Sequence, residues 1–152
     1  MADAPEAYPT HGTAIAVDGR AALIVGPSGA GKSDLALRCL ALAPSPLIPA
    51  PAQLVADDRV ILSPQGGRLR VSAPATIRDR LEVRGMGILE IPCVESADLV
   101  LVVELAGSEA IERLPDPPPQ RAFLDVSLPV LRLAPFEASA PVKLLLALGR
   151  AP

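Results

Sequence analysis

Tryptophan is absent from the sequence, and aromatic residues make up only 2% of its 152 residues. Since 50% of the residues are hydrophobic, small and branched aliphatic side chains must fill the interior. Apolar runs of the roughly 18 residues that a membrane-spanning helix needs are also missing. The first ten residues, MADAPEAYPT, have neither the basic lead nor the apolar core of a signal peptide. We therefore expect a cytoplasmic protein with no membrane partner.

Two further classes of protein are excluded by what the sequence lacks. The net charge is −3, and the 14 lysine and arginine residues form no basic block. Proteins that bind nucleic acid gather cations against its phosphates, so we expect no nucleic-acid partner. The only cysteines, Cys39 and Cys93, fit no metal-binding spacing, and we interpret them as buried reduced thiols.

The length suits a single domain with a buried core. We expect residues 1–10 to form a flexible lead and residues 11–152 to form that domain. Alternating and β-branched runs, turn residues and prolines predict strands at 13–17, 21–25, 53–56, 59–63, 68–72, 88–94, 98–105, 122–126 and 130–133, and helices at 33–42, 75–81 and 142–148. This irregular order predicts an α/β fold with a mixed β-sheet around one main helix.

The most specific motif is GPSGAGKS, residues 26–33, which lies between an apolar strand and an amphipathic helix. It fits the phosphate-binding P-loop pattern G-x-x-x-x-G-K-[ST] at every fixed position. Glycines let backbone N–H groups approach phosphate oxygens, and the following helix N-terminus attracts negative charge. The expected nucleotide-binding residues are Gly26, Pro27, Ser28, Gly29, Ala30, Gly31, Lys32 and Ser33.

An adjacent acidic pair, Asp57 and Asp58, lies between the strand-like runs QLVA and RVIL. A P-loop also needs an acidic partner for Mg²⁺, and two aspartates allow a second role as general base on an incoming hydroxyl. Successive side chains of a strand point in opposite directions, so the two would not easily share one role. A solvated Asp-Asp turn is the alternative.

The stretch LEVRGMGILEI, residues 81–91, places charged residues between apolar ones and then two glycines before an apolar run. On its own it is weak evidence, because Gly85 and Gly87 predict a loop over residues 82–87. Glu82 and Arg84 could then be an ordinary surface pair.

Together these segments resemble the catalytic domain of the HPr kinase/phosphorylases. The likeness is carried by HGTAIAVDGRAALIVGPSGAGKSDLAL, LVADDRVIL and LEVRGMGILEI. Members of that family are bacterial enzymes that phosphorylate a seryl hydroxyl of HPr, a phosphocarrier of the sugar phosphotransferase system. Their fold resembles the nucleotide-binding core of phosphoenolpyruvate carboxykinase. The resemblance thus implies a protein-serine kinase that uses ATP and Mg²⁺ and has an HPr-like phosphocarrier as its partner.

The resemblance also implies roles for the acidic pair and the P-loop. Lys32 would act on the transferred phosphate, and Ser33 would bind Mg²⁺. Asp57 would take the seryl proton in the kinase direction. In the reverse direction, where inorganic phosphate attacks phosphoserine and pyrophosphate leaves, Asp57 would return the proton. Asp58 would lie on the Mg²⁺ side.

The resemblance also implies roles for three residues outside the P-loop and the acidic pair. Glu82 would help to hold the metal, and Arg84 would steady phosphate charge. His11 matches the family's early histidine, with a hydrogen-bonding role at the start of a strand as the alternative.

The sequence departs from the family near its C-terminal end, where LPVLRLAPFEASAPVKLLLAL contains no Gly-Arg-Asn triplet after the Pro-Val. Two other functions therefore stay open, namely a nucleotide-binding regulatory module without phosphoryl transfer and a small-molecule kinase. The apolar helix expected at 142–148 also leaves open whether the chain forms a homo-oligomer.

Overall fold

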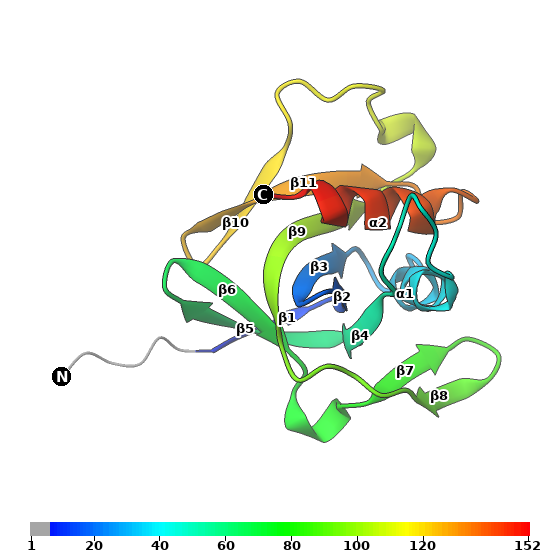
Figure 1. Ribbon diagram of the computed structural model, residues 1–152, viewed down its shortest axis with the longest axis vertical. Coiled ribbons are helices and arrows are strands. Elements are labelled where there is room, and N and C mark those ends of the chain that lie inside the picture. Colours follow the sequence, from blue (N-terminus) through cyan, green and yellow to red (C-terminus); the bar gives the residue numbers. More distant parts are fainter. Residues whose placement is uncertain (1–6) are drawn as a thin grey trace.

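A single curled sheet organises the computed structural model, which describes residues 7–152 (Figure 1). Nine strands belong to this sheet, and two more form a separate hairpin. The sheet strands are β1 (Tyr8–His11), β2 (Thr13–Val17), β3 (Arg20–Val25), β4 (Gln53–Ala56), β5 (Arg59–Gln65), β6 (Arg68–Ser72), β9 (Ala97–Leu105), β10 (Gln120–Phe123) and β11 (Val126–Leu133). The hairpin strands are β7 (Arg80–Val83) and β8 (Gly87–Glu90), and the α-helices are α1 (Lys32–Ala41) and α2 (Ala140–Arg150).

The centre of the sheet is β9, the β-branched and apolar strand. It pairs in parallel with β3 and with β11, whereas its pairing with β6 is antiparallel. The sheet continues from β3 through β2 to β4, and from β6 through β5 to β1. Both pairing directions occur in one sheet beside the P-loop helix, so the predicted mixed α/β fold is confirmed.

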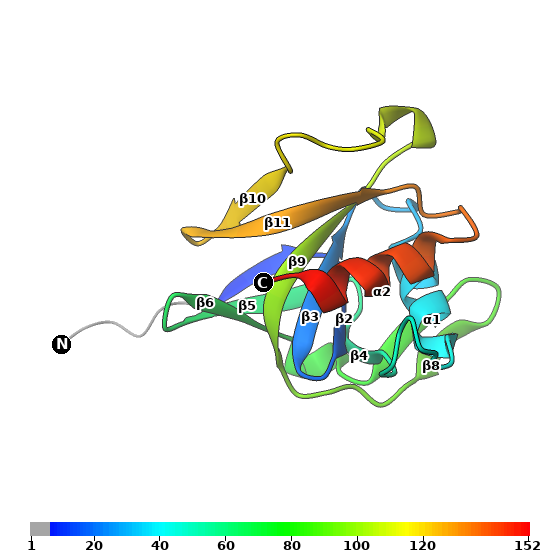
Figure 2. The same ribbon diagram turned by 45° about the horizontal axis from the view of Figure 1, so that its top comes forward.

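The two faces of the sheet bury separate apolar clusters, because successive residues of a strand point to opposite faces. Along β3, for example, Leu23 belongs to the cluster inside the curl and Ile24 to the cluster beneath the helices. Helices α1 and α2 lie together on this second face (Figure 2). The packing fixes the N-terminus of α1 at the end of β3, where the P-loop connects them.

The expected flexible lead over residues 1–10 is wrong for residues 8–10. Tyr8, Pro9 and Thr10 belong to β1, which pairs antiparallel with β5. Residues 1–6 lie outside the described part of the chain.

The segment from 75 to 94 also differs from expectation. The helix predicted at 75–81 is a single 3₁₀ turn, Ala75–Ile77, and the loop predicted at 82–87 is a strand pair with a tight turn. Gly85 and Gly87 have φ of +89° and +101°, conformations that glycine adopts readily, so the chain reverses within three residues. The strand predicted at 88–94 is limited to Gly87–Glu90.

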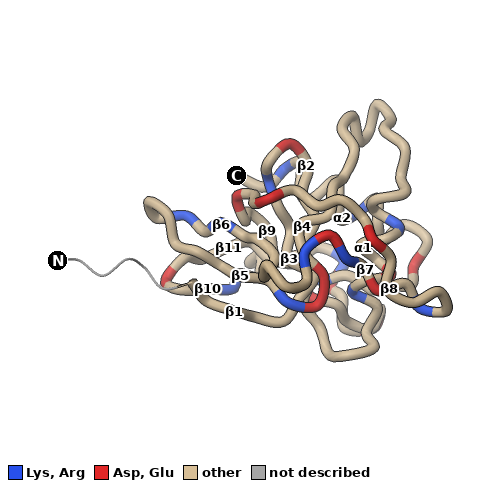
Figure 3. The backbone as a smooth tube through the Cα atoms, turned by 90° about the horizontal axis from the view of Figure 1, so that it is seen from below, with Lys and Arg blue, Asp and Glu red and all other residues tan. Residues whose placement is uncertain are grey.

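Charged residues of both signs are interspersed over the molecule (Figure 3). Neither α-helix of residues 7–152 has the length and apolar character to span a membrane. Both cysteines are free thiols, but only Cys39 is buried as predicted, whereas Cys93 is half-buried.

Candidate active site

The P-loop joins the end of β3 to the first turn of α1. Gly29 and Gly31 have φ of +79° and +104°, which turn the backbone sharply ahead of Lys32. The Ala30 N–H donates to the Pro27 carbonyl at 3.1 Å and closes this turn. The loop thereby presents backbone N–H groups at a helix N-terminus, the arrangement that attracts phosphate.

Lys32 bends back over this loop. Its Nζ donates hydrogen bonds to the carbonyls of Gly26 at 2.8 Å and Pro27 at 3.0 Å. Both carbonyls belong to the loop that would surround a phosphate. The ammonium group is therefore held at the rim of the loop, within reach of a phosphate bound there.

Asp57 is buried and accepts three hydrogen bonds. Its Oδ1 accepts from Thr13 Oγ1 at 2.9 Å and from Ser33 Oγ at 2.6 Å. Its Oδ2 accepts from the Glu82 backbone N–H at 2.9 Å. The carboxylate thus connects β2, the start of α1 and the β7–β8 hairpin.

Asp58 lies in a different environment, although it is the next residue. Its φ of +68° turns the chain between β4 and β5, and its exposed side chain lines a cavity with His11 and Thr13. The Gly12 N–H donates to the Asp58 carbonyl at 3.0 Å and fixes this turn. Asp58 therefore lines the cavity with an exposed side chain, whereas Asp57 is buried against Ser33 and Thr13.

The two aspartates thus differ in their surroundings, and their roles as general base and metal-side acid remain predictions. Both oxygens of Asp57 accept hydrogen bonds in this structure. Asp57 lies against Ser33, the residue expected on the metal. Asp58, which was expected on the metal side, is the exposed member of the pair.

The β7–β8 hairpin forms the opposite wall of the cavity. Leu81 is fully buried and anchors the hairpin, while Glu82 and Arg84 line the cavity from the same strand and the turn that follows it. The segment expected to be a loop is thus the structure that carries both of these charged side chains.

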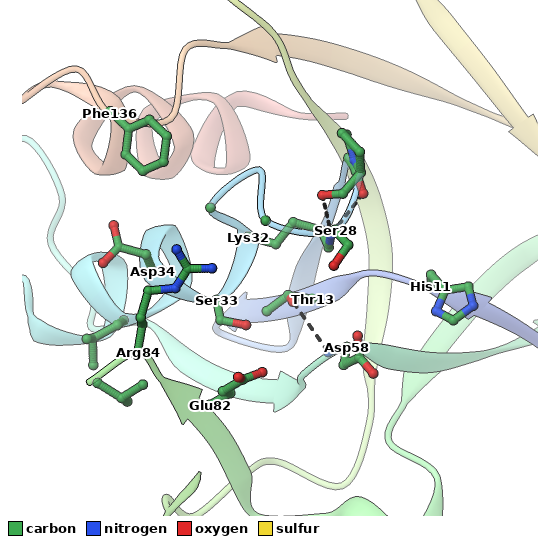
Figure 4. Close-up of a pocket in the computed structure, with 16 residues that line it drawn as sticks. His11, Thr13, Ser28, Lys32, Ser33, Asp34, Asp58, Glu82, Arg84 and Phe136 are labelled. Atoms are coloured by element: carbon green, nitrogen blue, oxygen red, sulfur yellow. Dashed lines mark hydrogen bonds between the residues drawn. The ribbon is translucent and has the colours of Figure 1, made fainter. Parts of the chain in front are cut away.

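The cavity has a volume of about 850 Å³. Ligand pockets for small molecules are commonly about 300–1,000 Å³, so a nucleotide fits this size range. Figure 4 shows Lys32, Ser28 and Ser33 in its middle, with His11 and Asp58 to one side and Arg84, Asp34 and Phe136 to the other. The structure therefore places the P-loop, Asp58, Glu82, Arg84 and His11 around one cavity, while Asp57 is hydrogen-bonded to Ser33 behind its wall.

Sequence reasoning missed two residues of this site. Thr13 is completely buried and positions Asp57, but a threonine at the start of a strand carries no signal of that role. Phe136 reaches the P-loop from the segment between β11 and α2, more than one hundred residues along the chain.

The fold and the site define a P-loop phosphate-binding domain built on a mixed sheet. The family model described as the HPr Serine kinase C-terminal domain matches residues 4–146. The chain belongs to this family, and the resemblance read from its motifs is confirmed.

Curated relatives with the name HPr kinase/phosphorylase include one from Lactiplantibacillus plantarum, 32% identical over 149 residues, which cover 91% of this chain and 42% of the relative. Another, from Clostridium novyi, is 42% identical over 91 residues, covering 60% of this chain and 27% of the relative. The chain thus spans less than half the length of these relatives.

A solved structure has the same fold. The HPr(Ser) kinase/phosphatase from Coxiella burnetii superposes with a TM-score of 0.76 at 22% sequence identity, covering 92% of this chain and 93% of that one.

Proposed function

We propose that this domain transfers phosphate from ATP to a seryl hydroxyl of an HPr-like phosphocarrier protein, in the cytoplasm. The observation that supports this most is the separation of the two aspartates. Asp57 is hydrogen-bonded to Ser33 of the P-loop, and the exposed side chain of Asp58 lines the cavity. A kinase needs one acidic group at the metal and another at the acceptor hydroxyl, and this pair supplies both.

In this proposal the roles of the pair are exchanged relative to the sequence prediction. Asp58 takes the proton, because its side chain is exposed at the cavity. Asp57 stays on the metal side, because its Oδ1 lies 2.6 Å from Ser33 Oγ.

The residues around the P-loop fit Mg²⁺. Ser33 and Glu82 offer a hydroxyl and a carboxylate oxygen, the hard ligands that this ion prefers, and Asp57 is hydrogen-bonded to Ser33. Ser33 would bind the ion directly, with Asp57 behind it and Glu82 on the opposite wall. Bound Mg²⁺ neutralises charge that develops on the β- and γ-phosphate oxygens.

The proposed reaction is an in-line transfer. The seryl oxygen forms a bond to the γ-phosphorus while the bond from phosphorus to the bridging oxygen breaks, and ADP leaves. The seryl proton passes to Asp58. Lys32 exchanges its hydrogen bonds to the loop carbonyls for contacts with the β- and γ-phosphates, and Arg84 adds positive charge from the hairpin.

Transfer can be tested directly by incubating the chain with γ-³²P-ATP, Mg²⁺ and an HPr-like carrier. We expect label on the carrier and none on a carrier whose target serine is replaced by alanine. A second arm supplies the phosphorylated carrier with inorganic phosphate and measures pyrophosphate, which reports the reverse reaction. Tight ATP binding without any labelled carrier, across a panel of seryl carriers, would instead identify a regulatory module.

A further inference from the structure

Phe136 is an exposed aromatic residue in the wall of the nucleotide cavity. It lies between β11 and α2, and 71% of its surface is accessible. Because the ring lies in the cavity wall and most of it is accessible, it is available for contact with a bound ligand.

The loop that carries Phe136 is held in place from both sides. The Arg38 guanidinium donates to the carbonyl of Pro135 and forms an ion pair with Asp34 at 3.0 Å. On the other side, Glu137 pairs with Lys143 at 2.8 Å. These contacts hold the backbone on either side of the aromatic residue.

The ring itself rests on the P-loop. A Cβ atom added to Gly31 would lie only 2.9 Å from Cζ of Phe136. The edge of the ring is therefore against the loop, while most of its surface stays accessible.

The position of Phe136 along the cavity suggests what it contacts. Lys32 and Ser33 lie in the middle, and Asp58 lies on the far side from Phe136 (Figure 4). The γ-phosphate must face Asp58 for transfer to a hydroxyl. The α-phosphate, the ribose and the base must then extend away from Asp58, toward Phe136.

Apolar side chains gather at this end of the cavity. Leu37 lies one helical turn beyond Asp34 on α1, and Val83 faces the cavity from the hairpin. Leu37 and Val83 are both half-buried. With Phe136 they contribute apolar surface to the cavity from three different elements, on the side where Asp34 and Arg84 also lie (Figure 4).

We propose that Phe136, with Leu37 and Val83, forms a nucleobase subsite in which the phenyl ring stacks on the base of the bound nucleotide. This subsite rests on the proposed function, because it takes the nucleotide whose phosphates the P-loop holds. Stacking on an aromatic side chain depends on the ring face of the base, so removing the phenyl group weakens binding of a nucleotide but not of its phosphates alone.

The test compares ATP with inorganic tripolyphosphate, both with Mg²⁺, by calorimetry on the whole chain. We expect Phe136→Ala to weaken ATP binding by about fivefold or more and to leave tripolyphosphate binding unchanged. Leu114→Ala is the matched control, since Leu114 is 82% exposed and does not line the cavity. This control should change neither affinity.

Phe136→Trp provides an independent readout, because the chain has no other tryptophan. We expect ATP to quench its fluorescence and tripolyphosphate to leave it unchanged.

An equal loss of affinity for ATP and for tripolyphosphate in Phe136→Ala, or no loss of affinity for either, would overturn the subsite. So would a raised KM for the carrier with unchanged ATP affinity, which would make Phe136 a docking residue. The two proposals can fail separately. If Phe136→Ala weakens ATP binding alone but the wild-type chain transfers no phosphate to a carrier, the subsite is supported and the proposed function is contradicted.

Discussion

Ser33 Oγ donates a 2.6 Å hydrogen bond to Oδ1 of Asp57. This bond joins the last residue of the P-loop to an aspartate from the turn between β4 and β5. Thr13 and the Glu82 backbone contribute the remaining hydrogen bonds to the same carboxylate. The phosphate-binding loop, the acidic pair and the hairpin are therefore positioned relative to one another by a single buried side chain.

Replacing Asp58 by asparagine should lower the rate of phosphoryl transfer by about 10²–10⁴-fold, the usual contribution of a general base. ATP binding should change little, because the P-loop is untouched. Asparagine also accepts the left-handed backbone conformation of this position, so the turn should persist. Steady-state kinetics with a seryl carrier, together with ATP calorimetry, measure both quantities.

Asp18→Asn is the matched control for that experiment, since Asp18 also has positive φ, +50°, in the turn between β2 and β3. It should retain full activity. Normal transfer by Asp58→Asn, with loss of transfer only in Asp57→Asn, would restore the original assignment of the base to Asp57.

Replacing Asp57 by alanine should destabilise the fold. The change leaves the buried Thr13 hydroxyl and the Glu82 N–H without their acceptor, at about 1–3 kcal/mol for each unsatisfied group. Urea denaturation measures the free energy of unfolding. Glu112→Ala, at an exposed acidic residue, should leave that free energy nearly unchanged, and equal stabilities for the two variants would argue against a structural role for Asp57.

Gly31→Ala should cost more stability than Gly19→Ala. Both glycines have positive φ, +104° and +78°, so each alanine incurs backbone strain of roughly 1–2 kcal/mol. Only Gly31 has a close neighbour, because an added Cβ there would approach the Phe136 ring. Adding Phe136→Ala to Gly31→Ala should remove the difference between the two single variants in urea denaturation. If the difference persists, the ring does not rest on the loop.

The Cys39 thiol should make stability depend on alkaline pH. Burial raises the pKa of Cys39 from 9.0 to about 12, so the folded state holds this proton more tightly than the unfolded state. The resulting stabilisation is fully present below pH 9 and is lost as the pH rises from 9 toward 12. Urea denaturation between pH 8 and 10.5 should therefore give a steeper decline for the wild type than for Cys39→Ala. Parallel slopes would contradict this prediction.

Local sequence signals predicted the elements that depend on local interactions. The P-loop with its strand and helix is one such unit, and Asp98–Leu105 was correctly expected to form a central strand because it is β-branched and apolar. Its neighbours β3 and β11 come from segments far apart in the sequence, so their parallel pairing with β9 could not be read from any single segment.

The hairpin was missed because its two glycines were taken as signs of a loop. Gly85 and Gly87 instead form a turn between two short strands whose apolar anchor, Leu81, packs at the base of the site. The available signal was the alternation of apolar and polar residues, as at Leu81 and Glu82. In strands of only four residues this alternation is too short to predict a strand.

The roles within the acidic pair could not be settled from the sequence for a different reason. Which carboxylate faces the cavity depends on the left-handed backbone of Asp58 and on partners 44 and 24 residues from Asp57, namely Thr13 and Ser33. The place of Phe136 over Gly31 likewise depends on the packing of α2 against α1, which brings the end of the chain to the P-loop.

The hydrogen bond from the Glu82 amide to Asp57 links the hairpin to the same carboxylate that accepts a hydrogen bond from Ser33. A ligand that drew the Ser33 hydroxyl away from Asp57 would change the surroundings of the carboxylate that accepts this amide proton. Deuterium uptake at this single amide would therefore register occupancy of the phosphate end from the opposite wall, without a dye or a coupled assay.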